Sequence, residues 1–185
     1  MLHMEQKDYK LEIVNILLKG GNHVRALAKK FNTNHMIISR RMKELFDSNV
    51  VDYNLEGKNK VYFLKKNLEV KAFIFAAENY KLIQLLKKYP FLRKIIERIQ
   101  ENNKIKLAIL FGSYAKQSAE KGSDIDIYIE TKDKKIKQGL EILDSNLSVK
   151  IGEYDKKNLL IREIEKNHVI VKGVEVYYEK NKFFK

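Results

Sequence analysis

The amino-acid sequence predicts an α+β protein with two unlike folded parts and a helical connector between them. Residues 5–66 contain helical patterns of apolar residues, followed by a change to period-two alternation. Residues 67–103 are helical in pattern, whereas residues 104–185 alternate short strands with helices. We therefore expect domain boundaries at 1–66, 67–103 and 104–185, with a small mixed sheet in the last part.

The composition restricts the class of protein. Of 185 residues, 44% are hydrophobic, which is enough for a packed core, and the formal net charge is +13. This charge favours polyanionic partners such as nucleic acid or a nucleotide, although a lysine-rich surface gives the same count. The sequence has no cysteine, so disulfides and zinc–thiolate sites are excluded. No apolar run reaches the roughly 20 residues that span a bilayer, and we expect a soluble cytoplasmic protein without a membrane partner.

Apolar spacing predicts the elements of the N-terminal part. Helical periodicity covers residues 8–18, residues 24–31, and a third segment that Thr33 or Asn34 caps and that ends near residue 46. The apolar residues of the third helix that we expect to point inward are Ile37, Ile38, Met42, Leu45 and Phe46. Period two then appears in residues 50–55 and 60–64, on either side of a glycine-containing turn, which predicts a β-hairpin.

Three helices followed by a hairpin with a basic tip resemble a winged helix-turn-helix domain. The resemblance covers residues 5–66 and implies that the third helix enters the major groove of DNA while the hairpin contacts phosphate. The candidate DNA-binding residues are Asn34, His35, Ser39, Arg40, Lys43, Lys58 and Lys60. Double-stranded DNA is therefore the expected partner. Winged helices also serve as dimerisation or docking modules, which leaves a homodimer open.

Helical periodicity continues over residues 68–89, which end before Pro90, and over residues 91–101. These helices form the predicted connector. Further along the chain, the pattern predicts a helix over 132–144, a strand over 147–151 and a helix over 158–167. Residues 169–178 are expected to form a strand, a turn at Gly173 and a second strand.

The most informative stretch runs from residue 109 to residue 130. An apolar strand breaks at Gly112-Ser113, and the chain returns as a strand in which Asp124 and Asp126 share one face. Their Cα atoms lie roughly 6.5–7 Å apart, so the carboxylates repel each other unless a cation lies between them. Mg²⁺ in such sites usually also binds substrate phosphates, and Gly112 lets the backbone approach a phosphate closely. The stretch therefore predicts a site for a nucleoside triphosphate.

The run Phe111-Gly112-Ser113-Tyr114-Ala115-Lys116, followed by Gly122-Ser123-Asp124-Ile125-Asp126-Ile127, resembles the signature of the DNA polymerase β-like nucleotidyltransferase superfamily. It is most similar to the minimal nucleotidyltransferases. The resemblance implies that Asp124 and Asp126 are the catalytic and metal-binding residues, with Mg²⁺ as cofactor. The nucleoside triphosphate, ATP first, would be bound by Gly112, Ser113, Lys116 and Ser123. Minimal members are often antitoxins that adenylylate a HEPN-type toxin, which implies such a protein as acceptor.

The sequence departs from this superfamily where a third acidic residue is expected on the next core strand. The outward positions of residues 147–151 are Ser148 and Lys150, and Glu153 lies beyond the strand. Two functions stay open. The first is Mg²⁺-dependent transfer of a nucleoside monophosphate to an unidentified acceptor hydroxyl. The second is a DNA-binding regulator whose degenerate domain senses nucleotide. Tyr114 either stacks on a base or packs in the core.

Overall fold

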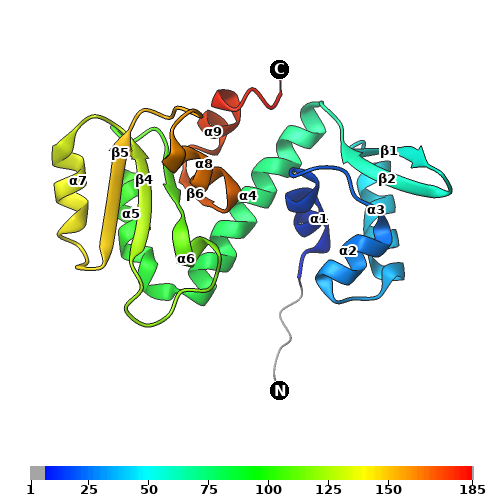
Figure 1. Cartoon of the computed structure of the whole chain (residues 1–185), viewed down its shortest axis with the longest axis horizontal. Helices are drawn as coiled ribbons and strands as arrows, with labels where there is room; N and C mark the ends of the chain where they lie inside the picture. The colour runs from blue at the N-terminus through cyan, green and yellow to red at the C-terminus, as the bar shows by residue number, and fades with distance from the viewer. Residues whose placement is uncertain (1–6, 185) are drawn as a thin grey trace. The chain divides into compact units, whose positions relative to one another are not determined.

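The structure is a computed structural model that describes residues 7–184 (Figure 1). The chain divides into two compact units, one formed up to Ala77 together with Phe184, and one formed by Glu78–Phe183. The division falls inside a long helix, α4 (Leu68–Lys88). The domain boundaries expected at 66/67 and 103/104 stay predictions. No helix in the described part of the chain is long and apolar enough to cross a membrane.

The first unit has the order of elements of a winged helix. Its elements before α4 are α1 (Tyr9–Leu17), α2 (Val24–Phe31), α3 (His35–Asp47), β1 (Val51–Glu56) and β2 (Asn59–Leu64). The two strands pair antiparallel, and Asn22 forms an additional antiparallel bridge with Tyr62. The segment between α1 and α2 is thereby tied to the base of the hairpin. This arrangement confirms the predicted winged helix-turn-helix fold.

Helix α3 faces the core of the first unit with a narrower stripe than predicted. Ile38, Met42 and Leu45 are buried at helical spacing, as expected. Ile37 and Phe46, which were expected to point inward, are 42% and 41% exposed. Each is one residue, or about 100°, away from the buried stripe. The Phe46 ring instead packs near Tyr53 on the hairpin, with their centroids 5.9 Å apart.

The second unit is built on a four-stranded mixed sheet in the order β5-β4-β3-β6 (Figure 1). Strands β4 and β5 are parallel, and the other pairs are antiparallel. After α4 the elements are η1 (Pro90–Leu92), α5 (Arg93–Glu101), β3 (Ala108–Leu110), α6 (Gly112–Ala115), β4 (Ile125–Glu130), α7 (Lys134–Glu141), β5 (Leu147–Gly152), α8 (Leu159–Lys166), β6 (Val169–Lys172) and α9 (Val174–Lys180). The small mixed sheet predicted for this part of the chain is therefore confirmed.

The two faces of this sheet have different roles. Ile125, Ile127 and Ile129 on β4 pack in one apolar cluster with side chains of α5 and α7. Each buried isoleucine contributes about 1.5–3 kcal/mol relative to an exposed one, so this face anchors β4. Because successive side chains on a strand point to opposite faces, Asp126 lies on the other face, away from α5 and α7.

The prediction for residues 174–178 is wrong, because they form helix α9 and not a second strand. Gly173 has φ +82 and ends β6, and its carbonyl oxygen accepts a hydrogen bond from Tyr177 N at 2.9 Å. Tyr177 and Tyr178 are both buried. In a strand, these neighbours would face opposite sides of the sheet. As a helix, the segment buries both rings within the second unit.

Candidate active site

The glycine turn and the Asp126 carboxylate are in direct contact. Phe111 N, at the end of β3, donates a hydrogen bond to Asp126 O at 2.9 Å, which aligns the turn with β4. Gly112 has φ +70, a conformation that favours glycine. A Cβ atom placed on Gly112 would collide with Oδ2 of Asp126. Glycine is therefore required at this position both by the backbone conformation and by the carboxylate beside it.

The electrostatics of Asp126 are those of a carboxylate that lacks a full counter-charge. Burial raises the pKa of Asp126, and repulsion from Asp124 raises it further. Lys150 and a hydrogen bond from the Ser148 hydroxyl act in the opposite direction. Asp124 and Lys150 are both exposed. Asp124 thus acts on Asp126 across a partly open site, although Asp124 precedes β4, which begins at Ile125.

The position of the third acidic residue is occupied by a serine. The parallel register pairs Asp126 with Ser148 and Tyr128 with Lys150. Glu153 does not reach back toward the aspartates, since its Oε1 lies 2.6 Å from Lys132 Nζ and both side chains are exposed. Within residues 7–184, no group of three acidic or histidine side chains could hold a metal ion. That Asp124 and Asp126 hold a cation stays a prediction.

Residues 93–182 match the family model described as polymerase beta, nucleotidyltransferase. This region is a nucleotidyltransferase domain of the polymerase beta family. The paired aspartates and the glycine turn both lie within the matched residues of the nucleotidyltransferase domain. No curated protein sequence matches the chain significantly.

Among solved structures, the chain is similar to a winged helix-turn-helix domain and to two repressors. One is a homodimeric winged helix-turn-helix DNA-binding domain from Mycobacterium bovis, with 21% identity over 38% of this chain and 65% of that one, and a TM-score of 0.35. A second is the adhesin competence repressor of Streptococcus pyogenes, with 14% identity over 50% and 69% of the two chains and a TM-score of 0.40. A third is the transcriptional repressor BigR of Xylella fastidiosa, with 19% identity over 43% and 77%, and a TM-score of 0.37. The chain thus spans just under two thirds of the first of these proteins.

The other predicted nucleotide-binding residues of the nucleotidyltransferase domain have partners of their own. The Ser113 carbonyl oxygen accepts a hydrogen bond from Ser118 N at 3.0 Å. Lys116 Nζ lies 3.8 Å from Glu163 Oε1 on α8. Ser123 Oγ accepts a hydrogen bond from Glu120 N at 2.9 Å, which closes the loop before β4. The contacts of these residues do not test their roles toward a nucleotide.

Sequence reasoning missed a cavity beside the glycine turn. It has a volume of about 390 Å³ and includes Tyr114, whose neighbours in the wall are Tyr89 and Phe91. The loop before β4 also lines the cavity, together with Asp144 and Asn146, which precede β5. In the sequence, Tyr89-Pro90-Phe91 predicts only the end of a helix. The aromatic residue directly after the proline was the available signal for the cavity.

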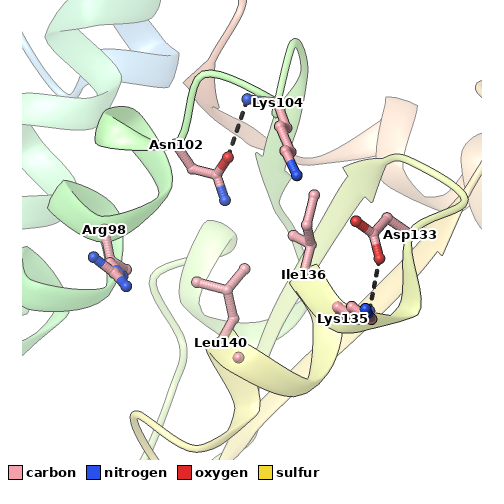
Figure 2. Close-up of a pocket in the computed structure, with 8 residues that line it drawn as sticks. Arg98, Asn102, Lys104, Asp133, Lys135, Ile136 and Leu140 are labelled. Carbon is pink, nitrogen blue, oxygen red and sulfur yellow. Dashed lines mark hydrogen bonds between the residues drawn. The ribbon is translucent and has the colours of Figure 1, made fainter.

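A second cavity, of about 320 Å³, lies between the ends of α5 and α7 (Figure 2). Its basic side chains are Arg98, Lys104 and Lys135. Figure 2 shows two local hydrogen bonds at its rim, from Lys104 N to Asn102 Oδ1 at 3.0 Å and from Lys135 N to Asp133 Oδ1 at 2.9 Å. None of the predicted catalytic or nucleotide-binding residues lines this second cavity.

The predicted DNA-binding residues lie on the surface of the first unit. All seven are exposed, five of them at the start and on the outer side of α3 and two on the hairpin. Asn34 Oδ1 accepts a hydrogen bond from Met36 N at 2.8 Å, so its side chain caps α3. Lys60 Nζ lies 4.0 Å from the centre of the Tyr53 ring, and Lys58 occupies the hairpin turn.

Two of the basic residues on α3 are held within the helix. Arg40 Nε lies 3.5 Å from Glu44 Oε1, and Lys43 Nζ lies 3.0 Å from Asp47 Oδ2. Such exposed pairs are weak, so a phosphate can compete for either side chain. Met36, which sequence reasoning did not select, is 64% exposed at the start of α3. Together with the exposed Ile37, it adds apolar groups to a surface that also contains polar and basic residues.

Proposed function

We propose that the nucleotidyltransferase domain transfers a nucleoside monophosphate from a nucleoside triphosphate to an acceptor hydroxyl and releases pyrophosphate. The observation that carries this proposal is the contact between the Gly112 turn and the Asp126 carboxylate. A close-approach backbone for phosphate and a carboxylate for metal are thereby side by side. The match of residues 93–182 to the polymerase beta family supports the same reaction class.

The residues of the site fit Mg²⁺ as a partner of the nucleotide. Mg²⁺ is usually bound by one or two carboxylates together with substrate phosphates and water, and Asp124 and Asp126 supply such a pair. The raised pKa of Asp126 indicates that its charge is incompletely neutralised by the protein alone. When bound, Mg²⁺ would neutralise charge on the phosphate oxygens.

In the proposed reaction the acceptor oxygen attacks the α-phosphorus, and the bond from that phosphorus to the bridging oxygen breaks. Asp124 and Asp126 hold the metal, while Gly112 and Ser113 orient the phosphates. Lys116 would exchange Glu163 for a phosphate oxygen, and Ser123 would flank the same end of the sheet. The proton leaves the acceptor hydroxyl without help from a third carboxylate, because Ser148 stands at that position. A base from the acceptor or from a partner protein would take it.

The winged helix is proposed to bind double-stranded DNA. Seven exposed residues support this role, and the basic ones among them are Arg40, Lys43, Lys58 and Lys60. The DNA-binding unit would bring the nucleotidyltransferase to a target site or control its own expression. A HEPN-type toxin as the acceptor rests on the resemblance to minimal nucleotidyltransferases, and a homodimer would suit a two-fold DNA site.

A second function is favoured by one observation. Ser148 lies beside Asp126 in the parallel register, where a third acid would otherwise stand. A domain with this site would bind Mg²⁺ and a nucleotide without turning the nucleotide over. The protein would then be a DNA-binding regulator that senses nucleotide.

One experiment separates the two functions. The full chain is incubated with Mg²⁺, ATP labelled on the α-phosphate, and a candidate acceptor, and both pyrophosphate release and transfer of label are measured. Asp124→Ala and Asp126→Ala are assayed in parallel for turnover and, by calorimetry, for Mg²⁺-dependent nucleotide binding. Turnover that both variants abolish supports the enzyme, whereas binding without turnover supports the sensor. Binding that is unchanged in both variants would reject the site.

A further inference from the structure

The cavity beside the glycine turn belongs to the same end of the sheet as the paired aspartates. Its wall includes Tyr114, which directly follows Ser113, and Ile125, which lies between Asp124 and Asp126 in the chain. All lining residues belong to the second unit; they are Tyr89, Phe91, Tyr114, Ala119, Glu120, Lys121, Gly122, Ile125, Asp144 and Asn146.

One side of this cavity is aromatic. The rings of Tyr89 and Tyr114 meet edge to face with centroids 4.9 Å apart, and Phe91 meets Tyr114 in the same way at 5.9 Å. Phe91 is 51% exposed, so part of its ring is not covered by protein. Large aromatic side chains are normally buried in the protein or covered by a partner. A planar ligand can stack on a ring that the protein leaves exposed.

The aromatic side also contains an unsatisfied polar group. The Tyr89 hydroxyl oxygen is buried and has no hydrogen-bond partner among the described residues. Buried hydroxyl groups nearly always have a partner, because leaving one unpaired is unfavourable. A ligand with a hydrogen-bonding edge would supply the missing partner.

A carboxylate also lines this cavity. Asp144 and Tyr114 line the same cavity. Burial raises the pKa of the Tyr114 hydroxyl, and Tyr89 and Asp144 raise it further. Asp144 Oδ1 accepts a hydrogen bond from Asn146 N at 2.8 Å, and its carboxylate has acceptor capacity for a ligand as well. The cavity thus combines a flat apolar wall, an unpaired hydroxyl and a carboxylate.

We propose that this cavity binds the base of the nucleoside triphosphate, with Phe91 as the stacking surface and Tyr89 and Asp144 as hydrogen-bonding groups. The inference rests on the proposed function, because the phosphates of the same molecule must lie at the Gly112 turn. A nucleobase has the required chemistry: a planar aromatic ring with hydrogen-bond donors and acceptors on its edge. The base would increase affinity beyond what the phosphates and metal provide.

The test compares two ligands that differ in the base and sugar. Calorimetry measures the binding of a non-hydrolysable ATP analogue and of inorganic tripolyphosphate to the full chain, each with Mg²⁺. We expect the ATP analogue to bind at least about tenfold more tightly. Phe91→Ala should lower the affinity for the analogue by at least about fivefold, since stacking of one base on one aromatic ring has an effect of this size. The same variant should leave tripolyphosphate affinity unchanged.

Tyr89→Phe provides an independent check that excludes misfolding. Removing an unpaired buried hydroxyl should leave the melting temperature unchanged or raise it, while the affinity for the ATP analogue falls. Phe46→Ala is the matched control, because it removes a comparably exposed phenylalanine from the first unit.

The possible outcomes are distinct. Equal affinity for the two ligands, unchanged by Phe91→Ala, would overturn the base site and leave the proposed function standing. Failure of both ligands to bind would overturn the proposed function and this inference together. Tighter binding of the ATP analogue that Phe91→Ala and Tyr89→Phe weaken, with tripolyphosphate unaffected, supports the base site.

Discussion

Gly112 combines two constraints that can be separated by mutation. Its φ of +70 disfavours any side chain, and a Cβ atom would in addition collide with the Asp126 carboxylate. We expect Gly112→Ala to lower the free energy of unfolding by about 1–3 kcal/mol and to abolish Mg²⁺-dependent nucleotide binding. Denaturant unfolding and calorimetry would measure the two effects.

Gly122→Ala is the matched control for Gly112→Ala. Gly122 has φ +86, but nothing lies within 4 Å of a Cβ atom placed there. The free energy of unfolding of this variant should fall by only about 1 kcal/mol, because only the backbone conformation disfavours a side chain there. Equal losses of stability in the two variants would show that the collision with the Asp126 carboxylate does not destabilise Gly112→Ala.

Asp126 gives a prediction about pH. Its pKa in the folded protein is raised by burial and by Asp124, so the folded state disfavours the ionised form. The resulting loss of stability is absent below the ordinary aspartate pKa of about 3.9 and develops as the pH rises through the higher folded value. Asp126→Asn should therefore melt at a higher temperature than the parent protein at neutral pH without Mg²⁺, and the difference should vanish near pH 4. A variant that is less stable at neutral pH would contradict this.

At the scale of single residues, the sequence predicted what short-range spacing determines. The end of β3 before Gly112 agrees with the predicted break, whereas Asp124 precedes β4, so the face that it shares with Asp126 stays a prediction. The unpaired hydroxyl of Tyr89 could not be predicted, because Tyr89 packs against residues far away in the chain, such as Tyr114. The functional roles of the site residues stay predictions.

At the scale of elements, the exposed residues of helix α3 and of the following hairpin predict how the first unit binds DNA. Lys58 lies in the hairpin turn, where a positive charge would contact phosphate. Lys58→Ala should weaken binding to duplex DNA of any sequence and reduce the slope of log affinity against log salt by about 0.9. Fluorescence anisotropy over a range of salt concentrations measures the slope.

The exposed Lys157, in the second unit, offers a control with the same change in net charge. If the winged helix is the DNA-binding surface, Lys157→Ala should leave the slope unchanged. Equal effects of the two variants would instead indicate that the overall charge of +13 attracts DNA without a defined site.

Most elements were predictable because their apolar periodicity agrees with their packing. Helix α2 has the predicted bounds, and the hairpin and a small mixed sheet were expected. Helix α9 was not, because Val174-Glu175-Val176 alternates as a strand does and contains β-branched residues. Tertiary packing overrides that local preference, since Tyr177 and Tyr178 are both buried in helix α9.

At the scale of the whole molecule, α9 is fixed to α4 by a polar contact between residues 100 positions apart in the chain. The Tyr178 hydroxyl donates to Glu78 Oε1 at 2.6 Å, and Lys81 Nζ lies 2.6 Å from Glu78 Oε2. Glu78 is only 1% exposed, so its charge depends on these two partners. Tyr178→Phe should lower the free energy of unfolding by about 1.5–3 kcal/mol, the usual range for a hydrogen bond to a charged group.

A double-mutant cycle with Glu78→Gln tests whether this loss comes from the contact itself. The effect of Tyr178→Phe should shrink in the Glu78→Gln background, because the acceptor is then uncharged. An equal loss in both backgrounds would assign the effect to ring packing and not to the hydrogen bond.

The contact between Gly112 and Asp126 has a consequence for energetics. Under the proposed function, the turn that receives the anion cannot shift without displacing a ligand of the cation. The two binding equilibria should then be linked: each partner should increase the affinity for the other by the same factor, in a range of about 5–150-fold. Titrating Mg²⁺ with and without nucleotide, and nucleotide with and without Mg²⁺, closes a thermodynamic square whose two ratios must agree.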